Sequence, residues 1–209
     1  MASVFIVRPF GTKSVMIAGQ PVEVDFNQVH KSLIQPAVEK NGLECRTTEV
    51  IAAAGNIRLD MFQMLIAYDL VIADISIDNA NVFYELGIRH GLRPNGTILI
   101  RFPSSGKDVP FDLKTDRYIQ YDQADPAAVV DLLARSIRDT IRDMRKLERK
   151  PDSPVFLLLP ELRPPDPALL IVVPRDFQEA VERAESDAEN GRPTLALLGV
   201  ALGSFDRFL

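Results

Sequence analysis

Cysteine and histidine are scarce: the 209 residues include one cysteine and two histidines. A single thiol, Cys45, cannot form an internal disulfide, and the three residues do not cluster at the ligand spacing of a zinc site. The sequence therefore predicts a protein without disulfides or a metal site that works in a reducing compartment.

Long hydrophobic runs and an excess of positive charge are also lacking. No stretch reaches the roughly 18 apolar residues of a membrane-spanning helix, and the start has no basic segment followed by an apolar one. The 24 Lys and Arg residues face 29 Asp and Glu, for a net charge of −5. Binding along a phosphate backbone needs many basic side chains. We expect a soluble, cytoplasmic protein with neither membrane nor nucleic-acid partners.

What the sequence does contain is an alternation of short apolar runs with segments of helical periodicity. Runs such as Val4–Val7 and Leu70–Ile75 are apolar throughout, which is typical of parallel strands buried on both faces. The predicted fold is α/β, a doubly wound, mostly parallel five-stranded sheet with helices on both faces. Strands are expected at 4–7, 43–48, 70–75, 97–100 and 118–121, and helices at 26–40, kinked at Pro36, and at 57–68, 81–92 and 126–150.

The composition changes after Lys150. Prolines crowd the segment 151–167 around the apolar stretch 155–159, and proline at this density disfavours helix. We expect a domain over residues 1–150 and, over 151–209, a proline-rich linker that packs on this domain, followed by a helix at 176–189. The apolar end, 195–202, has no evident partner in the sequence, which indicates a missing continuation or an oligomer contact.

Two segments fall where an open parallel sheet binds ligands, at the carboxyl ends of its strands. Arg8–Lys13 follows the first strand, and Asp74–Asn81 joins the strand at 70–75 to the next helix. The first segment lacks the glycine spacing of a phosphate loop or a dinucleotide fingerprint. ATP hydrolysis and NAD-dependent oxidoreduction are therefore unsupported.

Two carboxylates are the candidate catalytic groups. Glu85 lies on a helix that is apolar on most sides, where an unpaired buried charge is costly, so it lies either in water, paired with Arg89 one turn on, or in a site. Asp74 ends an apolar strand and either bonds to loop amides or belongs to the same site. The two carboxylates can converge on a sugar ring, as chemistry through an oxocarbenium-like state requires.

The segments Val71–Ser76 and Asn79–His90 resemble the nucleoside 2-deoxyribosyltransferase-like and TIR-like superfamily. The chain is more closely similar to bacterial TRAFs-binding-domain proteins, which are related to the N-terminal region of apoptosis signal-regulating kinases. This resemblance covers nearly the whole chain and implies a TIR-like or flavodoxin-like fold, with tetratricopeptide repeats following in a longer protein. The closer similarity is carried by Arg8–Gly11, Gly96–Ile100, Pro110–Leu113, Arg117 and Tyr121.

The resemblance also implies roles for individual residues. Glu85 matches the helix glutamate that acts as nucleophile or oxocarbenium stabiliser in active members, and Asp74 matches an acidic position that holds the sugar or base. The other implied contacts are Asp78 and Asn81 with ribose hydroxyls, Arg8 with a phosphate, and Phe10 with a base, unless Phe10 packs in the core.

Two functions follow from the resemblance. The first is binding of a nucleoside or nucleotide and cleavage of its base–sugar bond in stress or defence signalling, with NAD as a substrate and no cofactor. The second is a non-catalytic signalling or scaffold module that assembles with itself, with helical-repeat proteins or with TRAF-type partners. Catalysis needs Glu85 to be ionised, aimed into a pocket and free of a tight pair with Arg89, whereas a scaffold needs none of these.

Overall fold

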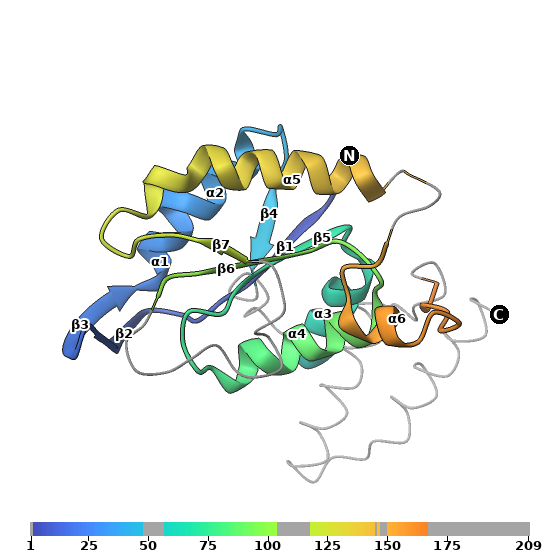
Figure 1. Cartoon of the computed structure of the whole chain (residues 1–209), viewed down its shortest axis with the longest axis horizontal. Coiled ribbons are helices and arrows are strands. Elements are labelled where there is room, and N and C mark those ends of the chain that lie inside the picture. The colour runs from blue at the N-terminus through green and yellow to red at the C-terminus, as the bar shows by residue number, and fades with distance from the viewer. Residues whose placement is uncertain (1, 48–56, 104–117, 145, 147–149, 167–209) are drawn as a thin grey trace, which may run out of the picture.

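The structure is a computed structural model that describes residues 2–47, 57–103, 118–144, 146 and 150–166. Its strands and helices alternate along the chain as the sequence predicts (Figure 1). The elements are β1 (Val4–Val7), β2 (Thr12–Ile17), β3 (Gln20–Asp25), α1 (Phe26–Val29), a π-helical stretch (His30–Ile34), α2 (Gln35–Glu39), β4 (Cys45–Thr47), α3 (Ile57–Ala67), β5 (Leu70–Asp74), α4 (Ala80–Leu92), β6 (Thr97–Arg101), β7 (Tyr118–Gln120), a 3-10 turn (Pro126–Val129), α5 (Val130–Met144) and α6 (Pro154–Leu158).

The central sheet has five strands in the order β4-β1-β5-β6-β7, and every neighbouring pair is parallel. Counted along the chain without the hairpin, this is the order 2-1-3-4-5 of flavodoxin-like folds. The predicted fold class is thus confirmed, with the sheet wholly parallel. Because parallel strands need crossover connections, the helices are forced onto the two faces of the sheet.

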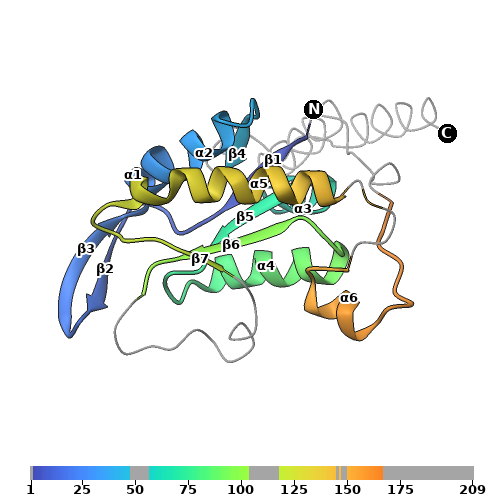
Figure 2. The same ribbon diagram turned by 45° about the horizontal axis from the view of Figure 1, so that its top comes forward.

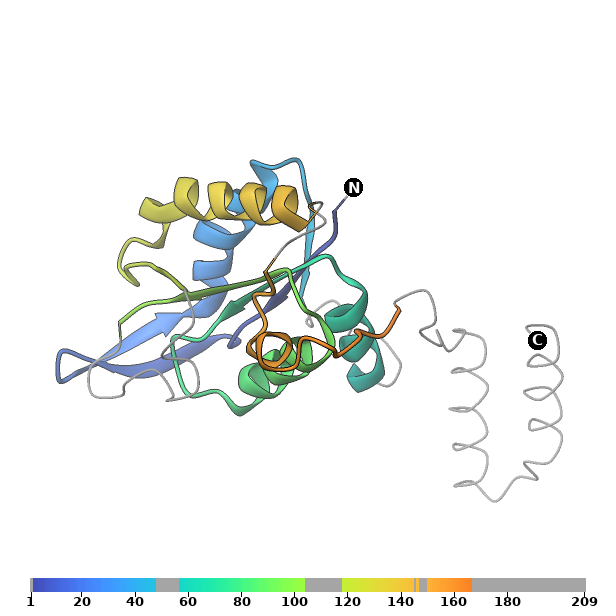
Figure 3. The ribbon, with the colours of Figure 1, turned by 45° about the vertical axis from the view of Figure 1, so that its right-hand side comes forward.

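The sheet is the middle of three layers (Figure 3). α1, α2 and α5 cover one face, where Ile6 and Ile72 are fully buried. α3 and α4 cover the other face, where Phe5 and Val71 are fully buried. Successive strand residues alternate between the two cores, which explains why the central strands β1 and β5 carry no polar residue until they end.

The antiparallel hairpin β2–β3 is an element that the sequence analysis did not predict. It projects beside the carboxyl end of the sheet (Figure 1), and its inward residues Val15 and Val24 join the core under α1. Most of its other side chains face solvent. Its apolar residues do not alternate cleanly with polar ones, because the exposed Met16 lies between Val15 and Ile17.

The hairpin turn contains the one non-glycine residue with positive φ in the described part of the chain. Ala18 has φ 49° and Gly19 has φ 80°. Two-residue hairpin turns of type I′ need positive φ at both positions, and a Cβ makes that conformation costly. Ala18→Gly is therefore expected to raise the free energy of unfolding by about 0.5–1 kcal/mol, measured by urea denaturation. An unchanged or lower midpoint would contradict a strained turn.

The predicted helix at 26–40 forms, from Phe26 to Glu39, but its middle is π-helical. The Gln35 amide donates to the His30 carbonyl, five residues back. Pro36 has no amide hydrogen to donate to the preceding turn, and the wider π-turn accommodates its ring without ending the helix. The structure thus shows a local widening of the helix just before Pro36, where the sequence predicts a kink.

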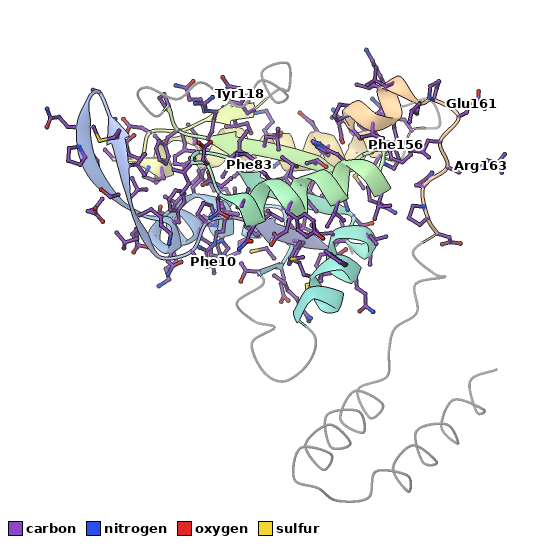
Figure 4. The ribbon with its side chains drawn as sticks, turned by 90° about the horizontal axis from the view of Figure 1, so that it is seen from below. Phe10, Phe83, Tyr118, Phe156, Glu161 and Arg163 are labelled. Atoms are coloured by element: carbon purple, nitrogen blue, oxygen red, sulfur yellow. The ribbon has the colours of Figure 1, made fainter. Side chains whose placement is uncertain are left out.

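Chain 150–166 packs at the far end of α4 and differs in part from the prediction. Proline was expected to prevent helix here, yet Pro154 begins α6, because Ser153 Oγ accepts hydrogen bonds from the Val155 and Phe156 amides. A first-turn proline has no amide to leave unpaired. Phe156 is buried against the C-terminal part of α4 (Figure 4), whereas Leu158 is 81% exposed. The predicted helix at 176–189 and the apolar end at 195–202 lie outside the described residues.

Among the described residues, no helix combines the length and the apolar character needed to cross a membrane.

Candidate functional site

The carboxyl ends of β1 and β5 meet at the point where the strand order reverses. β1 pairs with β5 on one side and with β4 on the other, and the chain leaves β5 in the opposite direction, toward β6. The connections after β1 and β5 therefore diverge to opposite faces, and this is the place where an open parallel sheet is expected to have its ligand crevice. The two segments singled out from the sequence, Arg8–Lys13 and Asp74–Asn81, begin at this switch point.

Arg8 leaves the end of β1 and is only 4% exposed. Its Nη1 donates to Asn27 Oδ1 at 2.8 Å and to the Pro9 carbonyl at 3.0 Å. Asn27 Oδ1 also accepts from the Gly11 amide at 3.3 Å, so one amide side chain from α1 holds both the arginine and the following loop. These bonds hold the guanidinium in place at the edge of the crevice.

Phe10 lies in the same loop, with the Arg8 guanidinium 4.8 Å from the centre of its ring. The Phe10 side chain is 36% exposed (Figure 4). It is therefore not packed in the core, and its ring is not fully free to stack on a base, the two alternatives that the sequence analysis left open. The cation occupies one ring face, an interaction worth about 0.5–1 kcal/mol at such a site. A base that stacks on Phe10 would have to use the other face.

Asp74 is buried in a polar cluster of the chain's own side chains. Its Oδ1 accepts from the Ser76 amide at 3.0 Å and from Ser76 Oγ at 2.5 Å, and its Oδ2 accepts from the Tyr121 hydroxyl at 2.8 Å. Ser76 Oγ in turn accepts from the Phe102 amide at 3.0 Å. Burial raises the pKa of the Asp74 carboxyl, while the bonds from Ser76 and Tyr121 oppose that rise. The cluster ties together the ends of β5, β6 and β7.

The structure does not bring Asp74 and Glu85 together. Asp74 continues the row of Leu70 and Ile72, whose side chains lie under α1 and α5. Glu85 belongs to α4, which packs on the opposite face of the sheet over Val71. The expected convergence of two carboxylates on one sugar is therefore not present, and Asp74 has the alternative role of bonding to the loop that follows it.

Glu85 is a buried carboxylate without a polar partner among the described residues. Its side chain is 9% exposed, and no hydrogen bond or ion pair to it is found among the described residues. Burial raises the pKa of the Glu85 carboxyl from 4.5 to about 7. A buried carboxylate without a partner costs stability, and such groups concentrate at functional sites.

Arg89 does not pair with Glu85, so the alternative of an exposed ion pair on the helix surface is wrong. Arg89 is completely buried, and its guanidinium donates to main-chain carbonyls alone in the described structure. Nη1 bonds to Leu65 and Tyr68, and Nη2 bonds to Asp69, Asn95 and Gly96, at 2.7–3.1 Å. Arg89 thus joins the end of α3 to the turn before β6.

The remaining candidates, Asp78 and Asn81, lie at the start of α4 and are exposed. Asn79, the residue after Asp78, caps the helix: its Oδ1 accepts hydrogen bonds from the Asn81 and Val82 amides at 3.0 and 3.2 Å. Asn79 therefore sets the direction in which α4 leaves the switch point. Asp78 and Asn81 therefore lie beside the switch point on the α4 side.

Sequence reasoning missed several residues that build this edge. Asn27 and Tyr121 act across the fold, and no local pattern indicates their partners, since Tyr121 lies 47 positions from Asp74. Ser76 and Asn79 carry a readable signal, because Asp-x-Ser after a strand and Asn before a helix are typical of loop and cap hydrogen bonds. Among the described residues, no three His, Cys, Asp or Glu side chains group as metal ligands.

Comparison with known proteins gave no match, neither to a family model nor to a curated protein sequence. The resemblance to the TIR-like superfamily therefore remains a prediction from the residues that carry it.

Replacing Glu85 by glutamine is expected to stabilise the fold above pH 7 by about 1–3 kcal/mol. The folded chain holds the Glu85 proton up to about pH 7, whereas the unfolded chain releases it near pH 4.5. The folded state thus binds more protons in this window, and the free energy of unfolding of the parent falls as pH rises through it. Glutamine has no charge to bury and removes that fall.

The measurement is urea unfolding of parent and variant at pH 5 and pH 8. The matched control is Glu44→Gln, since Glu44 is exposed. If both variants track the parent equally at the two pH values, Glu85 does not ionise within an apolar environment.

Proposed function

We propose that this chain is a TIR-like domain that binds a nucleoside or nucleotide, NAD included, at the carboxyl edge of its sheet and cleaves the base–sugar bond with Glu85. The observation that carries the proposal is the buried Glu85 carboxylate, which has no partner among the described residues, on the helix that starts at the switch point. Fold alone supports no activity, so the weight rests on this side chain.

The chemistry asks Glu85 to stabilise positive charge at the anomeric carbon. As the base leaves, the carboxylate either attacks this carbon or stabilises the oxocarbenium-like state, and water or a second acceptor then takes the sugar. The carboxylate form is the active one. Since the pKa of Glu85 is about 7, the rate is expected to rise with pH through neutrality.

The neighbouring residues receive more limited roles. Arg8, held by Asn27, places a positive charge beside the crevice for a phosphate, and Asp78 and Asn81 are exposed at its α4 side for ribose hydroxyls. Asp74 acts as a positioning residue, because its carboxylate holds Ser76 and Tyr121. The single, half-buried Cys45 suits a reducing compartment, and we assign the protein to the cytoplasm on that ground.

The test is chromatography of NAD and a panel of nucleosides incubated with the parent, Glu85→Gln and the exposed-site control Glu44→Gln. Release of free base by the parent and by Glu44→Gln, and a loss of at least about a hundredfold in Glu85→Gln, is the expected result. Ligand binding by calorimetry is measured in parallel. Turnover that survives in Glu85→Gln, or the absence of both binding and turnover in the parent, overturns the proposal.

One observation favours the second candidate, a non-catalytic assembly module. Four leucines in and after α6 are 39–81% exposed and form an apolar surface unusual for so short a segment. Such a surface suits a helical-repeat or TRAF-type partner. Under this alternative the parent binds no nucleotide, and Leu158→Glu abolishes capture of the partner. The leucines concerned are Leu157, Leu158, Leu159 and Leu162.

A further inference from the structure

β7 is the last strand of the sheet, and in the described part of the chain its one neighbour is β6. Its residues Tyr118–Gln120 lie parallel to Leu99–Arg101. Among the described residues, the outer edge of β7 therefore has no paired strand, and its backbone donors and acceptors can bond a further one. Proteins seldom leave such an edge without a partner or a protecting feature.

A groove of about 330 Å³ runs beside this edge, between Ile119 and α5. The α5 side of the groove is a stripe at helical spacing, so these side chains share one face of the helix. Leu132 stands at one end of the stripe and is 48% exposed, although the adjacent Leu133 is completely buried in the core. The stripe consists of Leu132, Arg135, Ser136, Asp139, Thr140 and Asp143.

The charges of this stripe are complementary to those of the same stripe on a second copy of the chain. If two α5 helices lie antiparallel about a two-fold axis near Ile137, Arg135 of each copy faces Asp139 of the other. The axis repeats this pair, and Ser136 and Thr140 between the charges are small enough for the helices to approach closely. A two-fold contact is isologous and needs such self-complementarity.

We propose that the β7 edge and the α5 stripe form the interface of a homodimer. Two β7 strands pair antiparallel through Ile119, which joins the two sheets into one, and the two α5 helices lie side by side above the junction. The exposed Leu132 side chains are removed from water at the contact, which supplies its apolar part. This arrangement covers the open edge of β7 in both copies.

The charges already present do not prevent this arrangement. Asp139 accepts from Arg142 of its own helix at 2.9 Å, but the Arg142 side chain is 65% exposed, so the pair is weak and leaves room for a second guanidinium. Asp143 likewise bonds to Lys146 at 2.7 Å. The ion pairs that the dimer adds, between Arg135 of one copy and Asp139 of the other, lie at the rim of the contact. They are therefore expected to affect the specificity of dimerisation more than its affinity.

The experiment is sedimentation of the full chain over a range of concentrations. The parent is expected to show a concentration-dependent dimer, and Leu132→Glu is expected to raise the dissociation constant at least tenfold. Leu158→Glu, which changes a still more exposed leucine on α6, is expected to leave the dissociation constant unchanged. Circular dichroism of each variant checks that the chain is folded.

A charge exchange tests the register. Arg135→Asp and Asp139→Arg are each expected to weaken the dimer, because each places like charges opposite one another. The double variant restores opposite charges and is expected to recover the parent constant within about threefold. A monomeric parent, a dimer that tolerates Leu132→Glu, a dimer broken by Leu158→Glu, or a double variant no better than the singles overturns the proposal. None of these outcomes depends on nucleotide binding or on Glu85.

Discussion

Gly96→Ala is expected to lower the free energy of unfolding by about 4 kcal/mol. Gly96 has φ +88°, and a Cβ built on it would lie 2.2 Å from the Asp69 carbonyl oxygen and 2.8 Å from Arg89 Nη2. The first clash is with backbone, which cannot rotate away. The second is with a guanidinium that is held by carbonyls on several segments. The added methyl group therefore separates the turn before β6 from the end of α3.

The matched control is Gly42→Ala. Gly42 also has a positive φ, +66°, but a Cβ there meets nothing within 4 Å. This variant carries the backbone strain alone and is expected to lose about 1–2 kcal/mol. The measurement is urea denaturation of both variants at one temperature and pH. Equal losses would show that the close approach at Gly96 is not tight in solution.

Arg89→Met is expected to cost about 3–5 kcal/mol. Methionine keeps much of the apolar stem but donates no hydrogen bond, so the carbonyls that Arg89 bonds lose a charged donor in a buried place. Arg89 is completely buried, and burial lowers the pKa of its guanidinium from 12.5 to about 9. The group is therefore still charged at neutral pH, and its bonds must offset the cost of removing that charge from water.

Arg138→Met is the control, because Arg138 lies on the exposed side of α5. A change within about 0.5 kcal/mol is expected there. Arg89→Lys supplies a second comparison: lysine keeps the charge, but one ammonium group cannot reach carbonyls on both sides of the arginine fork. A lysine variant as stable as the parent would mean that charge alone, and not the planar donor geometry, stabilises this junction.

The sheet was predictable because burial on both faces leaves an unmistakable sequence pattern. β1 and β5 are apolar at every position before their carboxyl ends, and the helices between strands show the longer period. The hairpin β2–β3 escaped prediction since most of its residues face water, and the strand predicted at 43–48 is longer than the three residues of β4. Segments with one solvent-facing side share their pattern with loops.

The sequence predicted where in the fold the candidate site lies, but not how its side chains are arranged. The two strand-end loops were found from topology alone, because ligands bind where strand order reverses. The pairing of Asp74 with Glu85 was inferred from spacing along the chain, which does not show the face of the sheet on which each side chain lies. The face on which Asp74 lies depends on how the side chains of β5 alternate between the two faces of the sheet. The face on which Glu85 lies depends on the side to which the connection after β5 crosses, and this connection places α4 opposite Asp74. Bonds such as Tyr121 to Asp74 depend on the assembled fold.

The attachment of chain 150–166 sets how the domain can be tethered. Asp152 Oδ2 accepts from the Gly96 amide at 2.8 Å, and Ser153 Oγ donates to the His90 carbonyl at 2.6 Å. Both contacts lie at the amino end of β6 and the far end of α4, across the molecule from the switch point (Figure 2). A surface or carrier linked just beyond Asp166 is therefore attached at the side of the domain opposite the switch point, so that the carboxyl edge of the sheet faces away from the support. Immobilised in this orientation, the protein keeps the carboxyl edge of its sheet clear of its own support (Figure 2).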